Sequence, residues 1–228
     1  MIELRSVEKI YGKKKNEFTA LKDVNFSIDS GASVAIIGKS GSGKSTLMHI
    51  MSGLDRPTTG EVIVSGRDIT KMKPKQLDAF RAEEMSFIFQ SFFVQGNETC
   101  FDNVSLPLEI TEVSQSKREK AVKAALKAVG LEEKIKQKAK DLSGGQKQRL
   151  AIARAIVGKP KILFADEPTG NLDSVTGSAV EELLFRFNKK LGSTLIIVTH
   201  DDELAARCDM QVRVKDGMII EIKKGGAR

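Results

Sequence analysis

The segment GKSGSGKST, residues Gly38–Thr46, constrains the fold of this chain more than any other feature. It follows the run VAII (Val34–Ile37), which is apolar on both faces and therefore typical of a buried central strand. A helix is predicted to follow, from Lys44 to about Ser52. In this strand–loop–helix setting the pattern G-x-x-x-x-G-K-[ST] indicates a loop whose backbone N–H groups bind a nucleoside triphosphate. A glycine-rich turn without a ligand is the plain alternative, and the full pattern in this setting disfavours it.

We call Gly38–Thr46 the phosphate loop. Its glycines let the backbone turn so that the N–H groups point inward. Lys44 is predicted to bridge the β- and γ-phosphates, and the Ser45 hydroxyl is predicted to hold Mg²⁺. The nucleotide-binding residues predicted here are Gly38, Lys39, Ser40, Gly41, Ser42, Gly43, Lys44, Ser45 and Thr46.

A second glycine-containing segment, LSGGQKQR at Leu142–Arg149, opens the helix predicted over 143–157. A serine followed by two glycines at a helix start is another anion-binding nest. One chain does not need two nests for one triphosphate, whereas two chains arranged head to tail do. The alternative, that Ser143 is only a helix N-cap and Gly144–Gly145 a flexible first turn, remains open at this point.

Two adjacent carboxylates, Asp166 and Glu167, end the apolar strand-like run ILFADEP. Asp166 at the strand end is predicted to reach Mg²⁺. Glu167 points elsewhere and is predicted to polarise an attacking water as a general base. The strand should deliver both residues to the sheet edge that carries Gly38, where ligands of open α/β sheets bind.

The order of predicted elements favours an α/β core interrupted by a helical lobe. Residues 1–65 are rich in strands, and residues 101–140 are helical, with a predicted capping box at Ser116 and Glu119 before a helix over Lys117–Val129. Strands and helices then alternate, with strands expected at 161–165 and 194–199, helices at 174–190 and 202–208, and a last hairpin through Asp216-Gly217.

Composition points to a soluble protein that works in a reducing compartment. The 228 residues are 40% hydrophobic and 29% charged, no apolar run approaches membrane-helix length, and the chain starts without a leader-like segment. Two cysteines are too few for a disulfide framework, which favours the cytosol. The net charge of +7 comes from scattered lysine clusters without interleaved aromatic residues, so we expect a solvated surface and no nucleic-acid partner.

Six motifs occur in a fixed order, and together they resemble the nucleotide-binding domain of ABC transporters over essentially the whole chain. They are the phosphate loop, Gln90 after a strand, LSGGQ, the pair Asp166-Glu167, NLD at Asn171–Asp173, and His200 at a strand end. The resemblance implies a P-loop NTPase core with a mostly parallel sheet, an N-terminal antiparallel β subdomain and an inserted α-helical signature subdomain. It places the core in residues 1–98 and 159–228 and the helical subdomain in about 99–158 of a single domain, 1–228.

The same resemblance implies roles for individual residues. Gln90 would touch Mg²⁺ and link the site to a membrane partner, His200 would contact the γ-phosphate, and Asp173 would line a dimer seam. Tyr11 stands where the family places an aromatic ring under adenine, with a packing role as the alternative, and His49 is expected to be an ordinary residue. The implied catalytic residues are Glu167, His200 and Lys44, the metal ligands Ser45, Gln90 and Asp166, and the residues of a second chain's nest Ser143, Gly144, Gly145 and Gln146.

Further segments are similar to the branch that serves lipoprotein release and the export of macrolides or antimicrobial peptides. They are SGLDRPTTGEV, DNVSLPLEI and DEPTGNLDS. This branch implies an ATP-bound homodimer on a permease with an extracytoplasmic domain, at the inner face of the cell membrane, with a cell-division ATPase as a near alternative. One departure stands out, since the stretch Val94–Thr99 is polar where relatives are apolar.

Two rival functions fit less well. DNA-repair and chromosome ATPases insert long coiled coils or zinc modules, for which the separation of Lys44 from Ser143 leaves no room, and ribosome-acting members usually carry two such domains. A P-loop kinase acting on a small molecule would leave the LSGGQ segment unexplained.

Overall fold

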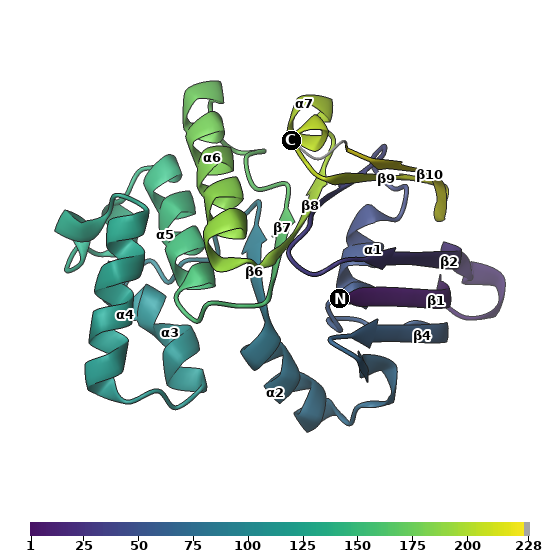
Figure 1. The fold of residues 1–228 in the computed structure, drawn as a ribbon, viewed down its shortest axis with the longest axis horizontal. Helices are drawn as coiled ribbons and strands as arrows, with labels where there is room; N and C mark the ends of the chain where they lie inside the picture. The colour runs from purple at the N-terminus through teal and green to yellow at the C-terminus, as the bar shows by residue number, and fades with distance from the viewer. Residues whose placement is uncertain (226–228) are drawn as a thin grey trace. The chain divides into compact units, whose positions relative to one another are not determined.

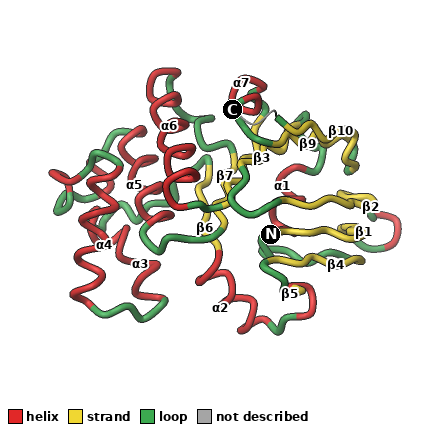
Figure 2. The backbone as a smooth tube through the Cα atoms, viewed as in Figure 1, coloured by secondary structure: helices red, strands yellow, loops and turns green. Residues whose placement is uncertain are grey.

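The computed structural model describes residues 1–225, so predictions that extend to residue 228 reach beyond the described residues. The chain forms two compact units, one of residues Met1–Arg81 with Thr194–Arg228 and the other of residues Ala82–Ser193. Figure 1 labels the helices and strands, and Figure 2 colours them by type. Each unit is described on its own below.

The first unit contains an antiparallel sheet in the order β2-β1-β4-β5. Its strands are β1 (Ile2–Tyr11), β2 (Phe18–Ile28), β4 (Thr59–Val64) and β5 (Arg67–Asp68). Alternating side chains of β1, such as Ile2 and Leu4, are buried, as expected for a sheet with one face on a core. This sheet is the predicted N-terminal antiparallel β subdomain.

The first unit also contains parallel strands that carry the phosphate loop. Strand β3 (Ser33–Ile37) lies between β8 (Thr194–Thr199) and β9 (Met210–Lys215) and is parallel to both, and β10 (Met218–Lys224) pairs antiparallel with β9. Every residue of β3 and β8 is buried, in accord with their unbroken apolar sequence. The helices are α1 (Lys44–Met51), α7 (Asp202–Ala206) and α2 (Pro74–Glu84), which continues across the unit boundary, with short 3₁₀ turns at Lys14–Asn16 and Ile69–Lys71.

The second unit contains two parallel strands and four long helices. Strand β6 (Met85–Phe89) pairs with β7 (Ile162–Asp166). The helices are α3 (Cys100–Ile110), α4 (Gln115–Ala128), α5 (Gly144–Ile156) and α6 (Ser174–Leu191), with 3₁₀ turns at Glu132–Lys134 and Ala139–Asp141. Helix α5 packs against α3, α4 and α6, and its apolar residues form the centre of this core. The predicted α/β fold with a helical region is confirmed.

Several predicted boundaries were wrong, one of them for an instructive reason. Helix α4 begins at Gln115 after the N-cap Ser114, so Ser116 lies inside the first turn and does not cap it. The residue three positions after Ser114 is Lys117, so Ser114 lacks the acidic partner of a capping box, and its side chain makes no capping hydrogen bond. The helix predicted over 202–208 ends at Ala206, where Arg207 serves as the C-cap. The capping boxes that do form pair Thr99 with Asp102 and Ser143 with Gln146.

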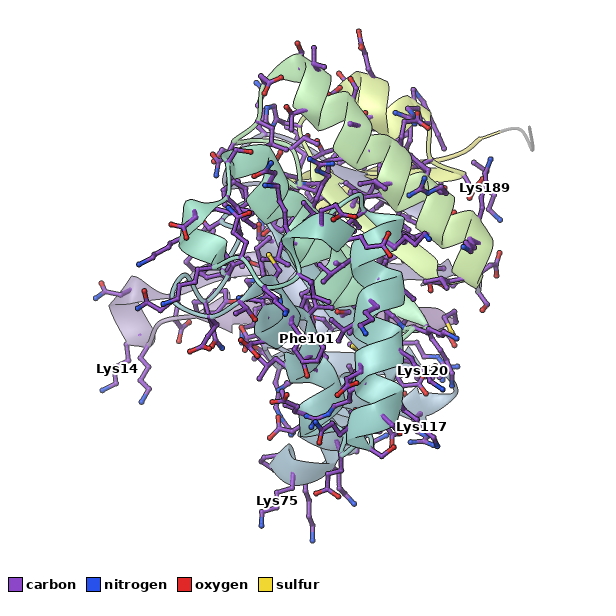
Figure 3. All side chains as sticks on the ribbon, turned by 90° about the vertical axis from the view of Figure 1, so that its left-hand side faces the viewer. Lys14, Lys75, Phe101, Lys117, Lys120 and Lys189 are labelled. Atoms are coloured by element: carbon purple, nitrogen blue, oxygen red, sulfur yellow. The ribbon has the colours of Figure 1, made fainter. Side chains whose placement is uncertain are left out.

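None of the helices in the described residues is both long and apolar enough to cross a membrane. The surface carries many lysines instead. In Figure 3, Lys117 and Lys120 extend outward from α4, as the amphipathic pattern of that helix predicts.

Candidate functional site

The phosphate loop connects β3 to α1 in the first unit. Its last glycine, Gly43, is the N-cap of α1 and has a φ of 105°, in the left-handed region. A Cβ atom at this position would lie 2.7 Å from the carbonyl oxygen of Ala20. The backbone can therefore approach β2 this closely only with glycine here, and the first N–H groups of α1 have no carbonyl partner within the helix.

The Lys44 side chain folds back onto the first residues of the phosphate loop. Its Nζ donates hydrogen bonds to the carbonyl oxygens of Gly38 at 2.9 Å and Lys39 at 3.0 Å. Its side chain is almost completely buried. The Lys44 ammonium group is thus held beside the loop backbone, in a position to contact a bound polyphosphate.

The loop lines an open hollow of about 470 Å³. Basic side chains Lys39, Arg213 and Lys215 surround it, and Asp216 is its one acidic residue. The buried hydroxyl of Ser42 also borders the hollow and has no hydrogen-bond partner among the described residues. An unsatisfied buried hydroxyl and a positive rim together suit an anionic ligand.

Tyr11 lies beside the phosphate loop. Its hydroxyl donates to Asp55 Oδ2 at 2.6 Å, and the Lys9 ammonium lies 4.6 Å from the ring centroid. Burial, with the Asp55 carboxylate, raises the pKa of Tyr11, while a hydrogen bond with Thr46 acts in the opposite direction. The residue as a whole is 39% exposed, so part of its surface is open to a ligand.

His200 follows β8 directly, at the same sheet edge as the phosphate loop. Strands β3 and β8 are parallel, and Ile37 is in register with Thr199. Gly38 follows the end of β3 and His200 follows the end of β8, so both lie at the same edge of the sheet. His49, the other histidine, lies in the last turn of α1.

The second unit gathers the acidic pair and Gln90. Phe89 is in register with Asp166 across β6 and β7, so Gln90 and Glu167 follow neighbouring strand ends. The Asn171 amide donates to the Gln90 carbonyl at 3.0 Å, and the Gln90 amide donates to Asn171 Oδ1 at 3.4 Å. Glu167 has a φ of 45°, an unusual backbone for a non-glycine residue, and its carbonyl oxygen accepts from the Gly170 N–H at 3.1 Å.

The LSGGQ segment caps α5 with its own side chains. Ser143 Oγ accepts from the Gln146 N–H at 3.3 Å, and Gln146 Oε1 accepts from the Ser143 N–H at 3.0 Å. The N-cap alternative for Ser143 is therefore realised in this structure. It leaves the anion-nest interpretation intact, because Gly144 is exposed and the segment borders an open hollow of about 460 Å³.

The same hollow is lined by the NLD segment. Asn171, Leu172 and Asp173 face it together with the start of α6. Asp173 Oδ1 accepts from the Thr176 N–H at 3.0 Å, and this backbone contact lowers the pKa of Asp173. The structure thus brings the predicted seam residue Asp173 beside Ser143, Gly144, Gly145 and Gln146.

The predicted residues fall into two groups, one in each unit. The first holds Tyr11, the phosphate loop and His200, and the second holds Gln90, the LSGGQ segment, the acidic pair and Asp173. The predicted metal ligands are divided in the same way, with Ser45 in the first group and Gln90 and Asp166 in the second. Within residues 1–225, no group of three or more His, Cys, Asp or Glu side chains could hold a metal ion by itself.

Sequence reasoning missed the side chains that support these groups. Asn171 holds Gln90, and Asp55 holds Tyr11. Gln148 is fully buried and donates to the Pro168 carbonyl, while Arg154 donates to the carbonyls of Phe92 and Phe93. The one available signal was Gln148 itself, a polar residue in register with the apolar face formed by Ile152 and Ala155.

Comparisons with known proteins agree with this geometry. Residues 21–170 match the family model described as ABC transporter. The chain is 45% identical to a lipoprotein-releasing system ATP-binding protein LolD of Syntrophotalea carbinolica, over 96% of each chain. It is 42% identical to the macrolide export ATP-binding/permease protein MacB of Rhodopirellula baltica, covering 97% of this chain and 33% of that longer protein.

A solved structure matches over 100% of both chains, with a TM-score of 0.91 and 38% identity. It is the dimeric ATP-binding cassette MJ0796 in a post-hydrolysis state, bound to ADP and Pi. The fold, the ordered motifs and these similarities have one explanation. The chain belongs to the ABC transporter family, as an ATP-hydrolysing subunit of the branch that includes lipoprotein-release and macrolide-export ATP-binding proteins.

Proposed function

We propose that this subunit works as a homodimer in which the phosphate loop of one chain and the LSGGQ segment of the other enclose each ATP. One observation carries the proposal: each unit presents its own helix N-terminus beside its own open hollow, at α1 and at α5. Two such anion-binding ends serve two nucleotides when the chains pair head to tail. The dimeric MJ0796 cassette, whose structure this chain matches, supports that pairing.

In this proposal the residues of one chain share the work of hydrolysis. The phosphate loop and the Lys44 ammonium bind and orient the phosphates, and Tyr11 stacks on the adenine. Glu167 accepts a proton from the attacking water, and His200 donates a hydrogen bond to the γ-phosphate. Ser143, Gly144, Gly145, Gln146 and Asp173 of the second chain exclude water and close the site.

Mg²⁺ is the metal that the proposed ligands fit. Ser45, Gln90 and Asp166 offer a hydroxyl, an amide and a carboxylate oxygen, the hard donors that this ion takes. Asp166 is the last residue of β7 and Gln90 directly follows β6, so these two proposed ligands lie at the ends of neighbouring strands. Bound there with ATP, the ion would neutralise negative charge on the β- and γ-phosphates.

We further propose that the dimer powers a membrane permease that carries an extracytoplasmic domain, at the inner face of the cell membrane. The names of the LolD and MacB relatives support this class of partner. Gln90 and the polar stretch Val94–Thr99 would transmit the movement caused by ATP binding and hydrolysis to the permease. Asn103 anchors this stretch at Gln95, since its Oδ1 accepts from the Gln95 N–H at 2.8 Å and its Nδ2 donates to the Gln95 carbonyl at 3.0 Å. The single domain proposed for 1–228, with its helical subdomain at about 99–158, accords with the presence of α3, α4 and α5 in that range.

The dimer and the base are tested together by Glu167→Gln. The variant keeps every group that binds ATP and loses the proton acceptor, so it should accumulate as an ATP-bound dimer with little turnover. Size-exclusion chromatography with saturating Mg-ATP measures the dimer, and wild type with Mg-ADP is the control. A variant that stays monomeric at all protein concentrations would exclude the two-chain site.

The role of the LSGGQ segment is tested by Ser143→Arg. The bulky side chain should abolish hydrolysis while nucleotide affinity of the isolated chain stays close to that of wild type. Ser116→Arg, on the exposed surface of α4, is the matched control. Equal loss of binding and hydrolysis in Ser143→Arg would place the segment at the nucleotide of its own chain.

The partner is tested by co-purification from the native membrane. Recovery of a membrane protein with a large extracytoplasmic domain supports the proposal. Recovery of ribosomes or DNA instead would contradict it.

A further inference from the structure

Gln148 makes an unusual contact inside the second unit. Its side chain is completely buried in α5, and its Nε2 donates to the carbonyl oxygen of Pro168 at 2.5 Å. Its other polar atom, Oε1, is buried and has no hydrogen-bond partner among the described residues. The amide is therefore only half satisfied.

A buried amide with only one of its polar atoms hydrogen-bonded destabilises the fold relative to an apolar side chain of the same size. A buried polar atom without a partner costs about 1–3 kcal/mol, a penalty that a methionine of similar length would avoid. Packing alone therefore does not account for an amide at this position. The hydrogen bond to Pro168 is the one feature that a methionine could not reproduce.

The segment that Gln148 holds contains the proposed general base. Pro168 follows Glu167, whose φ of 45° lies in the left-handed region. On the other side, Asp166 is fixed by the pairing of β7 with β6, in register with Phe89. The backbone of Glu167 is thus held at both neighbours, by the sheet before it and by Gln148 after it.

Such a backbone needs support. A left-handed non-glycine residue costs of order 1 kcal/mol or more and persists only when its surroundings hold it. The Glu167 carbonyl accepts from the Gly170 N–H at 3.1 Å, which closes the turn locally. Gln148 adds the link from this turn to a long helix, and that helix begins at the LSGGQ segment.

We propose that Gln148 is a positioning residue that sets the direction of the Glu167 carboxylate through the Pro168 carbonyl. Because Ser143 caps the same helix, one rigid element connects the LSGGQ segment to the base. In the proposed dimer, the start of α5 contacts the nucleotide held by the second chain. Binding of that nucleotide would then influence, through α5 and Gln148, the position of Glu167 in the same chain as α5. The inference rests on the proposed role of Glu167 and assigns the residue that aims it.

The experiment compares Gln148→Met with wild type in steady-state ATP hydrolysis by the full chain. The variant should lose about 10- to 100-fold in kcat, the scale of a misplaced catalytic group, with KM for ATP within about twofold of wild type. Its urea midpoint should stay close to that of wild type, because removal of the unpartnered Oε1 offsets the loss of the donor to the Pro168 carbonyl. Gln115→Met, at an exposed position of α4, is the matched control and should change none of these quantities.

A double-mutant comparison separates positioning from a general effect. If Gln148 acts only through Glu167, Gln148→Met should add nothing to the loss caused by Glu167→Gln. Independent, multiplying losses would overturn the inference, as would unchanged kcat in Gln148→Met or a fall in stability that parallels the fall in kcat. If Glu167→Gln alone keeps full turnover, the proposed function fails instead, and the two failures are distinguishable.

Discussion

A methyl group placed on Gly145 would lie 2.3 Å from Cγ2 of Thr176. The first turn of α5 and the first turn of α6 therefore meet with no room for a side chain between them. Both turns also line the hollow beside the LSGGQ segment. Ser143 and Asp173, the N-caps of the two helices, lie two and three residues before Gly145 and Thr176 in the sequence.

Gly145→Ala should therefore destabilise the protein by about 1–3 kcal/mol, the usual cost of overpacking. Thr176→Ser removes Cγ2 and keeps a hydroxyl, so the double variant should recover most of that loss. Gly144→Ala is the matched control, since its nearest neighbour would be Phe92 Cζ at 3.8 Å, an ordinary contact. Urea unfolding measures all four proteins, and equal stability of both single alanine variants would show that the helices separate easily.

The sequence predicted the strands of the core well for a physical reason. Apolar runs followed by glycine or polar turns predicted a strand that ends at Ile37 and a strand over 194–199, and the observed strands are Ser33–Ile37 and Thr194–Thr199. The positions of the motif residues in the fold were also predictable, because each such residue lies at the end of a strand, directly after one, or at the start of a helix. Asp166, Gln90 and His200 all stand at such places.

The supporting contacts could not be predicted in the same way. Gln148 meets Pro168, and Arg154 meets Phe92, across twenty or more residues of sequence, through side-chain positions that no local pattern encodes. The cap of α4 failed for a different reason. The local sequence favoured Ser116, which has Glu119 three residues later, yet the helix begins at Gln115 after Ser114. Most of the stability of a helix in a protein comes from packing of its buried face, here Val122 and Leu126, and a local capping signal does not report that packing.

The Tyr11 ring and the Tyr11 hydroxyl should make separate contributions to nucleotide affinity, which two substitutions can distinguish. Tyr11→Phe keeps the ring and loses the 2.6 Å hydrogen bond to Asp55, so nucleotide affinity should stay within about twofold. Tyr11→Ala should weaken it by about 1 kcal/mol, the scale of an aromatic stacking contact. Titration with a fluorescent ATP analogue measures both, and unchanged affinity in Tyr11→Ala would leave the ring with a packing role only.

Arg154 should control the loop that follows Gln90. Its guanidinium donates to the Phe93 carbonyl at 2.8 Å and the Phe92 carbonyl at 3.2 Å, and burial lowers its pKa. Arg154→Lys keeps the charge and cannot reproduce the two-pronged contact. Amide hydrogen exchange of residues 91–94 should therefore become faster in Arg154→Lys.

The rest of the molecule provides the reference for that measurement. Exchange in β3 and β8, which belong to the other unit, should stay unchanged in Arg154→Lys. Uniform acceleration throughout the chain would show a general loss of stability. It would contradict a local role of Arg154.

Cys208 should make the stability of the protein depend on alkaline pH. Burial, with the nearby Asp209 carboxylate, raises the pKa of its thiol to about 12, against about 8.5 in an unfolded chain. Between these values the unfolded state loses a proton that the folded state keeps. Stability from the buried neutral thiol is therefore complete below about pH 8.5 and falls as pH rises toward 12, by up to about 1.4 kcal/mol per pH unit.

The measurement is the free energy of unfolding at pH 8 and pH 10 for wild type and Cys208→Ala. The alanine variant starts lower, because a buried group is lost, and its stability should fall less between the two pH values. The two proteins share every other titratable group, so subtraction of the two slopes isolates Cys208. Parallel slopes would mean that the thiol ionises as readily in the folded protein as in the unfolded chain, and would contradict the prediction.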